Sequence, residues 1–204
     1  MARTGEHQPD VSGPKAAGRS GDAACLPARP LLHIVLHEPE IPNNTGNIGR
    51  TAVATGCALH LIKPLGFDIS EKACRRAGLD YWPRLAPRTH ESFDGYLQAE
   101  RPARLWLFTT HTTRSAHGAE IRPGDHLMFG KETAGLPTDL VERYGERAVC
   151  LPMVPGERSL NLATAVCAVI YLAVDQMLRR GEMRLDESGR MMLGPAAAGG
   201  CDGR

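Results

Sequence analysis

Short apolar runs alternate with segments of helical periodicity through the middle of the chain. Five runs have the length and the apolar content of strands: Leu31–Leu36, Leu59–Ile62, Arg104–Phe108, His126–Phe129 and Ala148–Leu151. The pattern between and after them predicts helices over Thr45–Thr55, Glu71–Ala77, Ser92–Ala99, Pro137–Tyr144 and Leu160–Leu178. Because strands alternate with helices, we expect an α/β fold with a mostly parallel sheet flanked by helices.

The two ends of the chain lack this pattern. Residues 1–30 are rich in Gly, Ala, Pro, Arg and Ser, which predicts a disordered N-terminal extension. Residues 186–204 are similar in composition and predict a disordered C-terminal tail. We therefore expect one domain over residues 31–180, since an apolar share of 42% in 204 residues is enough for a substantial core.

The last predicted helix, Leu160–Leu178, is apolar on nearly all sides. Between residues 160 and 174 only Asn161 and Thr164 are polar. Such a helix must be covered on more than one side, so one side can pack on the sheet and another needs a partner. A membrane anchor is the alternative, but the run is shorter than a span and closes at Asp175. We expect a homodimer formed through this helix.

Overall charge says little about function. A formal net charge of +1 does not indicate a nucleic-acid-binding protein, because such domains often carry a clear basic excess. A local excess exists, since Lys72, Arg75 and Arg76 fall on one face of the predicted helix Glu71–Ala77. This face is either an RNA contact or an ordinary solvated surface, and composition alone favours the second.

The six cysteines argue against a zinc site and against a disulfide framework. They contain no C-x-x-C pair, and several lie in apolar runs, as buried thiols do in a reducing cytosol. No apolar stretch approaches the roughly 20 residues of a membrane span, and the N-terminal region has no continuous signal-type core. We therefore expect a soluble cytoplasmic protein with no membrane and no metal partner.

A first polar motif, Asn43-Asn44-Thr45-Gly46-Asn47-Ile48-Gly49-Arg50-Thr51, opens the first predicted helix. Asn43, Asn47 and Arg50 are spaced i, i+4, i+7, so they form one stripe of two amides and a guanidinium. Such a stripe can bind ribose hydroxyls and a phosphate. The alternative is an asparagine-capped helix whose arginine makes a surface ion pair, and this segment taken alone favours that alternative.

Glycine spacing excludes two common classes of nucleotide-binding protein. Gly46 and Gly49 lack the G-x-G-x-x-G spacing of a dinucleotide-binding turn. Gly124 and Gly130 lie one residue too far apart for a P-loop, and Glu132 stands where that loop needs a magnesium-binding hydroxyl. Neither a Rossmann dehydrogenase nor a P-loop NTPase fits.

Two further motifs follow neighbouring predicted strands. The second, Phe129-Gly130-Lys131-Glu132-Thr133-Ala134-Gly135-Leu136-Pro137, has a glycine that permits close backbone approach and a carboxylate. The third, Leu151-Pro152-Met153, leads to Ser159-Leu160-Asn161. Two strand ends followed by loops make a crevice suited to a flat adenine. Two ordinary strand-to-helix turns are the alternative, which explains each loop singly but not its occurrence with the first motif.

In this order and spacing the three motifs resemble those of the SPOUT class of S-adenosylmethionine-dependent RNA methyltransferases, over about Leu32 to Met177. The most similar branch is that of the TrmL (YibK-like) tRNA wobble-ribose 2′-O-methyltransferases. The resemblance implies a C-terminal deep trefoil knot, which periodicity cannot reveal. It also implies that the knot loops bind S-adenosyl-L-methionine, through Phe108, Thr109, Gly130, Leu151, Met153 and Ser159.

The resemblance implies a reaction as well, methylation of the ribose 2′-hydroxyl of the tRNA wobble nucleotide, a cytidine or a modified uridine. The residues expected to be catalytic are Asn44, Arg50, Glu132, Ser159 and Asn161. A guanidinium with a pKa above ~12 is a poor general base, so we expect Arg50 to orient the target phosphate and stabilise a developing alkoxide. Lys72, Arg75 and Arg76 would extend the tRNA-binding surface.

Several alternatives stay open at this point. The enzyme could methylate another tRNA or rRNA site, or the chain could be an RNA-binding factor without turnover, which the complete set of motif residues argues against. Ser159 could also cap the last helix. Lys131, a cation beside a sulfonium cofactor, is expected to point away or toward RNA phosphate. The N-terminal extension could add RNA contacts through Arg3, Lys15, Arg19 and Arg29, but it is expected to be inert.

Overall fold

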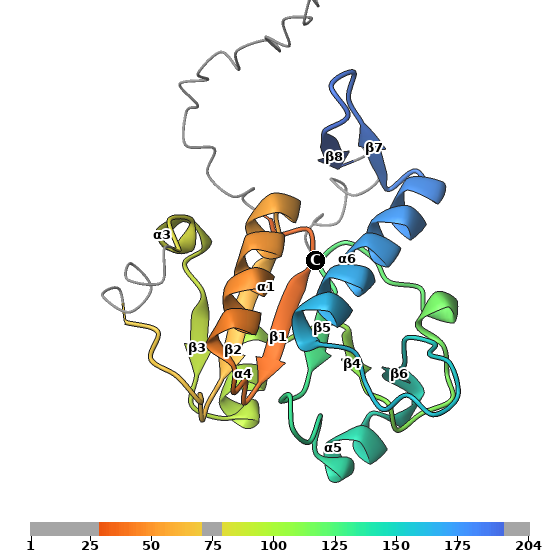
Figure 1. Cartoon of the computed structure of the whole chain (residues 1–204). Helices are drawn as coiled ribbons and strands as arrows, with labels where there is room; N and C mark the ends of the chain where they lie inside the picture. Colours follow the sequence, from red (N-terminus) through yellow and green to blue (C-terminus); the bar gives the residue numbers. More distant parts are fainter. Residues whose placement is uncertain (1–28, 71–78, 194–204) are drawn as a thin grey trace, which may run out of the picture.

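The computed structural model describes residues 29–70 and 79–193. Its centre is a six-stranded sheet in the order β3-β2-β1-β5-β4-β6, and all of its neighbouring strands are parallel (Figure 1). The strands are β1 (His33–His37), β2 (Ala58–Ile62), β3 (Arg88–His90), β4 (Leu105–Phe108), β5 (His126–Phe129) and β6 (Ala148–Val149). The predicted α/β class with a mostly parallel sheet is confirmed.

Helices cover both faces of this sheet. They are α1 (Pro42–Thr55), α3 (Trp82–Leu85), α4 (Phe93–Glu100), α5 (Thr138–Arg143) and α6 (Leu162–Arg179), with short 3-10 turns at Ala116–Gly118 and Gly145–Arg147. In Figure 1, α1 and α6 lie side by side on one face, and α4 lies behind the strands on the other. Side chains alternate along each strand, so Ile34 and Leu36 join the core under α1 and α6, whereas Val35 joins the core under α4 and α5.

Two predicted helix starts differ from the observed ones by two residues or more. Helix α1 begins at Pro42, three residues early, because a proline in the first turn needs no partner for a backbone N–H. Helix α6 begins at Leu162, two residues late, and its N-cap is Asn161, whose Oδ1 accepts from the N–H groups of Ala163 (2.9 Å) and Thr164 (3.3 Å). The alternative that Ser159 is the N-cap of this helix is therefore excluded.

Four short elements, one helix and three strands, were not predicted, because three or four residues are too few to show periodicity. They are α3, the edge strand β3, and an antiparallel hairpin of β7 (Met183–Leu185) and β8 (Met191–Leu193). The hairpin corrects the predicted disordered tail, since residues 186–193 are ordered as its turn and second strand. The Asp186 carboxylate holds the turn by accepting from the N–H groups of Ser188 and Arg190, both at 2.9 Å.

Helix α6 is two-sided. Seven of its residues are buried, whereas Thr164, Ala168 and Tyr171 recur at i, i+4, i+7 on an exposed face, and 54% of Tyr171 is accessible. By length and composition alone the helix could cross a membrane, but its buried side packs on α1 and the sheet core. The exposed side is the face on which the predicted dimer would form.

The predicted helix Glu71–Ala77 and the basic residues Lys72, Arg75 and Arg76 lie outside the described residues. So do residues 1–28 and 194–204 of the two predicted tails.

Candidate functional site

A cavity of about 480 Å³ opens at the carboxyl ends of β4 and β5, next to the first turns of α1 and α6. Ligands of open α/β sheets bind at such strand ends. The rings of Phe108 and Phe129 stack there with centroids 4.8 Å apart and an interplanar angle of 13°. All six residues that the resemblance assigns to the cofactor line this one cavity: Phe108, Thr109, Gly130, Leu151, Met153 and Ser159.

Gly130 is required by the protein's own backbone. A Cβ atom at this position would collide with the backbone of Gly135 and Leu136, because the loop closes on itself through a bridge between Lys131 and Gly135. Gly135 makes that closure possible with a φ of 70°, in the left-handed region. The close approach predicted at Gly130 therefore exists, but the nearest partner is the loop itself.

The Glu132 carboxylate joins the first and second motifs. Its Oε1 accepts from Asn44 Nδ2 at 2.9 Å and from the Ile41 N–H at 3.3 Å, and its Oε2 accepts from the Glu40 N–H at 2.8 Å. Ile41 is the N-cap of α1 and makes no side-chain cap of its own. The carboxylate thus sits where backbone N–H groups and the helix dipole favour negative charge.

The third motif continues this network. Asn161 Nδ2 donates to Asn44 Oδ1 at 2.9 Å, while Asn161 Oδ1 caps α6. Asn44 is buried and spans the gap between Glu132 and Asn161. Three of the five residues expected to be catalytic are thus bonded in a row, each from a different motif. Their bonds to one another fix the three loops around the cavity.

Arg50 is not among the described residues that line the cavity. It is exposed on α1, and its guanidinium carbon lies 4.9 Å from the ring centroid of Tyr81, within cation–π range. Tyr81 is itself buried, and its hydroxyl donates to the carbonyl of Gly46 in the first motif. The stripe predicted for Asn43, Asn47 and Arg50 is exposed as expected.

Lys131 lines the cavity, but its charge is paired. Its Nζ lies 3.1 Å from Glu38 Oε2, and both side chains are about one-third exposed. On the same loops, the Thr133 N–H and hydroxyl donate to Glu40 Oε2 at 3.1 and 2.8 Å. Burial lowers the pKa of the adjacent His37, which is therefore neutral at pH 7.

The cavity also contains residues that sequence reasoning missed. His111 and Arg158 both line it. Each lies within two positions of a residue that was predicted, His111 after Thr109 and Arg158 before Ser159. Proximity in sequence was the available signal, but it does not show which side chains of a loop turn inward.

Comparisons with known proteins show the family of the chain. Residues 31–171 match the model of the SpoU rRNA Methylase family. The tRNA (cytidine(34)-2′-O)-methyltransferase of Saccharophagus degradans is 45% identical over 72% of this chain and 96% of its own length. The enzyme of the same name from Escherichia coli K12 is 46% identical over 72% of this chain and 94% of its own. This chain belongs to the SpoU methylase family.

Solved structures give the same result. A protein described under "Structural insights into the 2-OH methylation of C/U34 on tRNA" is 47% identical, with a TM-score of 0.67 over 73% of this chain and 97% of that one. The SpoU methyltransferase AviRb of Streptomyces viridochromogenes in complex with AdoMet is 26% identical, with a TM-score of 0.62 over 77% of this chain and 62% of that one.

Proposed function

We propose that this chain transfers a methyl group from S-adenosyl-L-methionine to the ribose 2′-hydroxyl of a tRNA wobble nucleotide, as a tRNA (cytidine(34)-2′-O)-methyltransferase. The observation that carries the proposal is the hydrogen-bonded row of Asn44, Glu132 and Asn161, which joins all three motifs at one cavity. Relatives at 45% and 46% identity bear the name of this activity.

The cavity suits this cofactor. Its volume of about 480 Å³ lies within the roughly 300–1,000 Å³ of small-molecule sites. Leu151, Met153 and Phe129 supply apolar walls for a flat ring, and the strand-end loops supply backbone amides and carbonyls. The pairing of Lys131 with Glu38 offsets a cation that would otherwise repel a sulfonium.

The protein contributes position and charge to the reaction. S-adenosyl-L-methionine, when bound, supplies an electrophilic methyl group on a positively charged sulfur. In-line attack by a ribose oxygen depends on alignment, and Asn44, Glu132 and Asn161 act as positioning residues that fix the loops. Arg50 holds a target phosphate with its fork of donors and stabilises negative charge developing on the oxygen. Ser159, on the cavity wall, contacts the substrates.

Mapping the modified nucleotide tests the assignment. The purified chain is incubated with labelled S-adenosyl-L-methionine and unmodified tRNA transcripts, and the product is digested and analysed by mass spectrometry. We expect one 2′-O-methyl group, at the wobble nucleotide, and none in a transcript whose wobble ribose is a 2′-deoxyribose. Methylation at another tRNA position or only of rRNA would replace the substrate assignment, and no transfer to any RNA would refute the activity.

The same proposal includes a cytoplasmic homodimer with a trefoil knot in each chain. The exposed face of α6 around Tyr171, continuous with Asn161 at the cavity, supports the dimer. The path from β6 at the sheet edge back to α6 beside α1 supports the knot. Lys72, Arg75 and Arg76 of one protomer would then extend the tRNA surface next to the partner's cavity.

A charge at the centre of this face tests the assembly. Tyr171→Asp should give monomers with little tRNA methylation, because a buried unpaired carboxylate costs several kcal/mol. Gln98→Asp, on the exposed side of α4, is the matched control and should leave the dimer intact. Light scattering and methylation are measured on the same samples. A Tyr171→Asp monomer with full activity would refute the idea that catalysis needs the dimer.

A further inference from the structure

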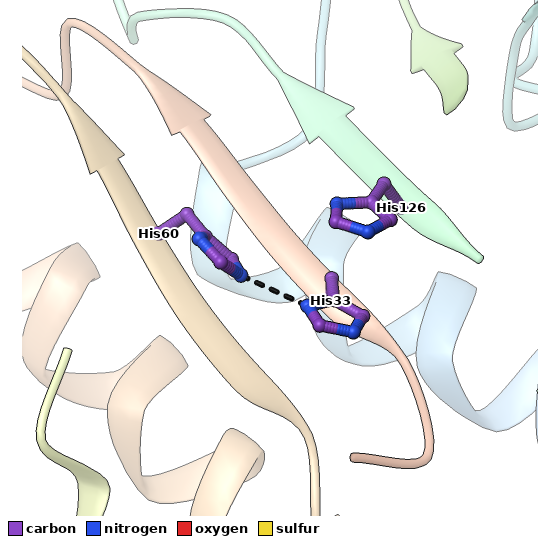
Figure 2. A group of neighbouring side chains, drawn as sticks. All are labelled: His33, His60 and His126. Carbon is purple, nitrogen blue, oxygen red and sulfur yellow. Dashed lines mark hydrogen bonds between the residues drawn. The ribbon is translucent and has the colours of Figure 1, made fainter. Parts of the chain in front are cut away.

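Four histidines lie together on the face of the sheet that α4 covers. His33 begins β1, His60 lies in β2, His90 ends β3 and His126 begins β5. Figure 2 shows His33, His60 and His126 on the same side of three adjacent strands, with the 2.9 Å hydrogen bond between His33 and His60. These four described histidines are not among the residues that line the cavity, so the proposed methyl transfer leaves them without a role.

Three potential metal-ligating atoms converge beside this layer. His60 Nδ1 lies 3.2 Å from His90 Nε2 and 3.6 Å from Glu100 Oε1, and His90 Nε2 lies 3.8 Å from that same Oε1. Around a tetrahedral Zn²⁺ with bonds of about 2.0–2.1 Å, ligand atoms lie roughly 3.3–3.4 Å apart. We propose that His60, His90 and Glu100 bind a divalent transition-metal ion of the Zn²⁺ type.

The neighbours of these three residues orient them as partners of metal ligands usually do. His60 Nε2 lies 2.9 Å from His33 Nδ1, and in the tautomer in which His60 Nε2 is the donor to His33, His60 keeps a lone pair on Nδ1 for the ion. Arg88 Nη1 donates to Glu100 Oε2 at 2.8 Å, which leaves Oε1 for the ion. Two imidazoles and one carboxylate are a common donor set for zinc.

A second trio, His33, His60 and His126, is less suited to one ion. The rings of His33 and His126 stack face to face, with centroids 4.0 Å apart and an interplanar angle of 7°. The lone pairs of stacked rings lie in parallel planes and do not point at one common atom. In addition, His126 Nδ1 is already bonded to the Tyr96 hydroxyl at 2.6 Å.

The position of the proposed site indicates a structural role for the ion. Its ligands come from β2, β3 and α4, and β3 is a three-residue edge strand with one neighbouring strand in the described sheet. A strand this short gains little from its own ladder. An ion shared with β2 and α4 would fasten the edge, and water would complete the coordination.

Metal titration of the full chain tests this proposal. Protein treated with a chelator and then dialysed is titrated with Zn²⁺ by calorimetry and with Co²⁺ by visible spectroscopy. We expect one ion per chain, visible bands typical of four-coordinate Co²⁺, and a rise in melting temperature on adding Zn²⁺. His90→Gln and Glu100→Gln each remove a ligand, so each should weaken this binding by more than the roughly 10–100-fold that loss of a ligand's partner costs, whereas His126→Gln should retain it.

The variants also distinguish metal binding at this site from metal binding elsewhere on the chain. Circular dichroism checks that each variant is folded, and the two ligand variants provide independent tests. If the wild-type chain binds no ion, the proposal fails. It fails equally if His126→Gln loses the ion while Glu100→Gln keeps it, or if no histidine or glutamate variant changes the number of ions bound, because cysteines or surface histidines then hold them.

Discussion

The cavity and the histidine layer are both clusters of polar side chains, but they are built from different parts of the chain. Most cavity residues lie in loops that follow strands, and most of these loop residues fall within short motifs of the sequence. The histidines lie within or at the ends of strands, and the bonded pairs are 27 and 30 residues apart in sequence. Only the first kind of cluster leaves a local pattern in the sequence.

The two clusters also satisfy their polar groups differently. Around the cavity, side chains such as Glu132 and Asn44 bond to one another and to backbone, and the loop backbone remains available to a ligand. In the histidine layer the ligand atoms face each other inside the protein, where polar groups require either shared protons or an ion. The cavity can therefore bind and release its substrates, whereas the histidine layer would keep a bound ion in place.

The largest expected effect concerns the RNA side of the cavity. Arg50→Ala should slow methyl transfer, because the loss of an oriented charged donor removes about 2–4 kcal/mol of transition-state stabilisation. Cofactor affinity should stay within a few fold, since Arg50 is not among the residues that line the cavity. Single-turnover methylation and calorimetry with S-adenosyl-L-methionine measure the two quantities. Cofactor binding that falls in step with activity would show that Arg50 belongs to the cofactor side.

Arg50→Lys sharpens this result. Lysine keeps the charge but lacks the planar fork that stacks on Tyr81 and holds a phosphate bidentately. We expect an intermediate rate. A lysine variant as fast as the wild type would mean that charge alone suffices.

The sequence alone predicted the class of fold, because each of the longer strands and helices shows its own apolar pattern. It could not reach the edge strand β3 or the β7–β8 hairpin, whose three-residue strands are defined by partners rather than by their own periodicity. The same limit explains the cap of α6. Ser159 and Asn161 are both good capping residues, and the contact of Asn161 with Asn44 is visible only in the structure.

The candidate site was also predicted only in part. The motifs predicted which residues surround the cavity, but the row from Glu132 to Asn161 joins segments about ninety to one hundred and seventeen residues apart. The expectation of no metal rested on cysteine spacing, which carries no information about histidines brought together by strand pairing. Parallel pairing of β1 with β2 and β5, and of β2 with β3, assembles that layer.

The next largest effect is expected at Glu132, and it tests whether the hydrogen bonds of the cavity network stabilise the fold. Glu132→Gln replaces an oxygen that accepts hydrogen bonds with an NH₂ group, which would face the donors of Asn44 or Glu40. We expect a loss of roughly 1.5–3 kcal/mol in the free energy of unfolding, because a charge-assisted bond is broken, together with slower methylation. Urea denaturation measures the first. Glu142→Gln, an exposed change on α5, should alter neither, and an equally stable Glu132→Gln would contradict the positioning role.

A smaller effect is expected from the glycine that closes the second motif. Gly130→Ala should destabilise the fold by about 1–3 kcal/mol and weaken cofactor binding with it, because the added methyl collides with the backbone of Gly135 and Leu136. Gly118→Ala is the control, since a Cβ there meets nothing within 4 Å. If affinity fell while stability stayed unchanged, the methyl would be blocking the cofactor directly rather than the loop.

The smallest effect lies in the histidine layer and depends on pH. Burial, followed by the charges of His33 and Arg88, lowers the pKa of His126 to about 3, so its folded form is neutral near pH 7. In the unfolded chain this histidine binds a proton near its ordinary pKa of about 6.5. The unfolded state therefore binds more protons as the pH falls below that value, and stability is lost on the acidic side.

We expect His126 to account for about 1 kcal/mol of stability lost between pH 7.5 and pH 5.5. Urea denaturation of the wild type and of His126→Gln at both pH values measures this contribution, with a chelator present so that only protons compete for the histidines. The variant should lose less stability on acidification than the wild type. Equal losses would mean that His126 is no harder to protonate in the folded protein than in the unfolded chain, and that the layer is open enough to accept charge without a bound ion.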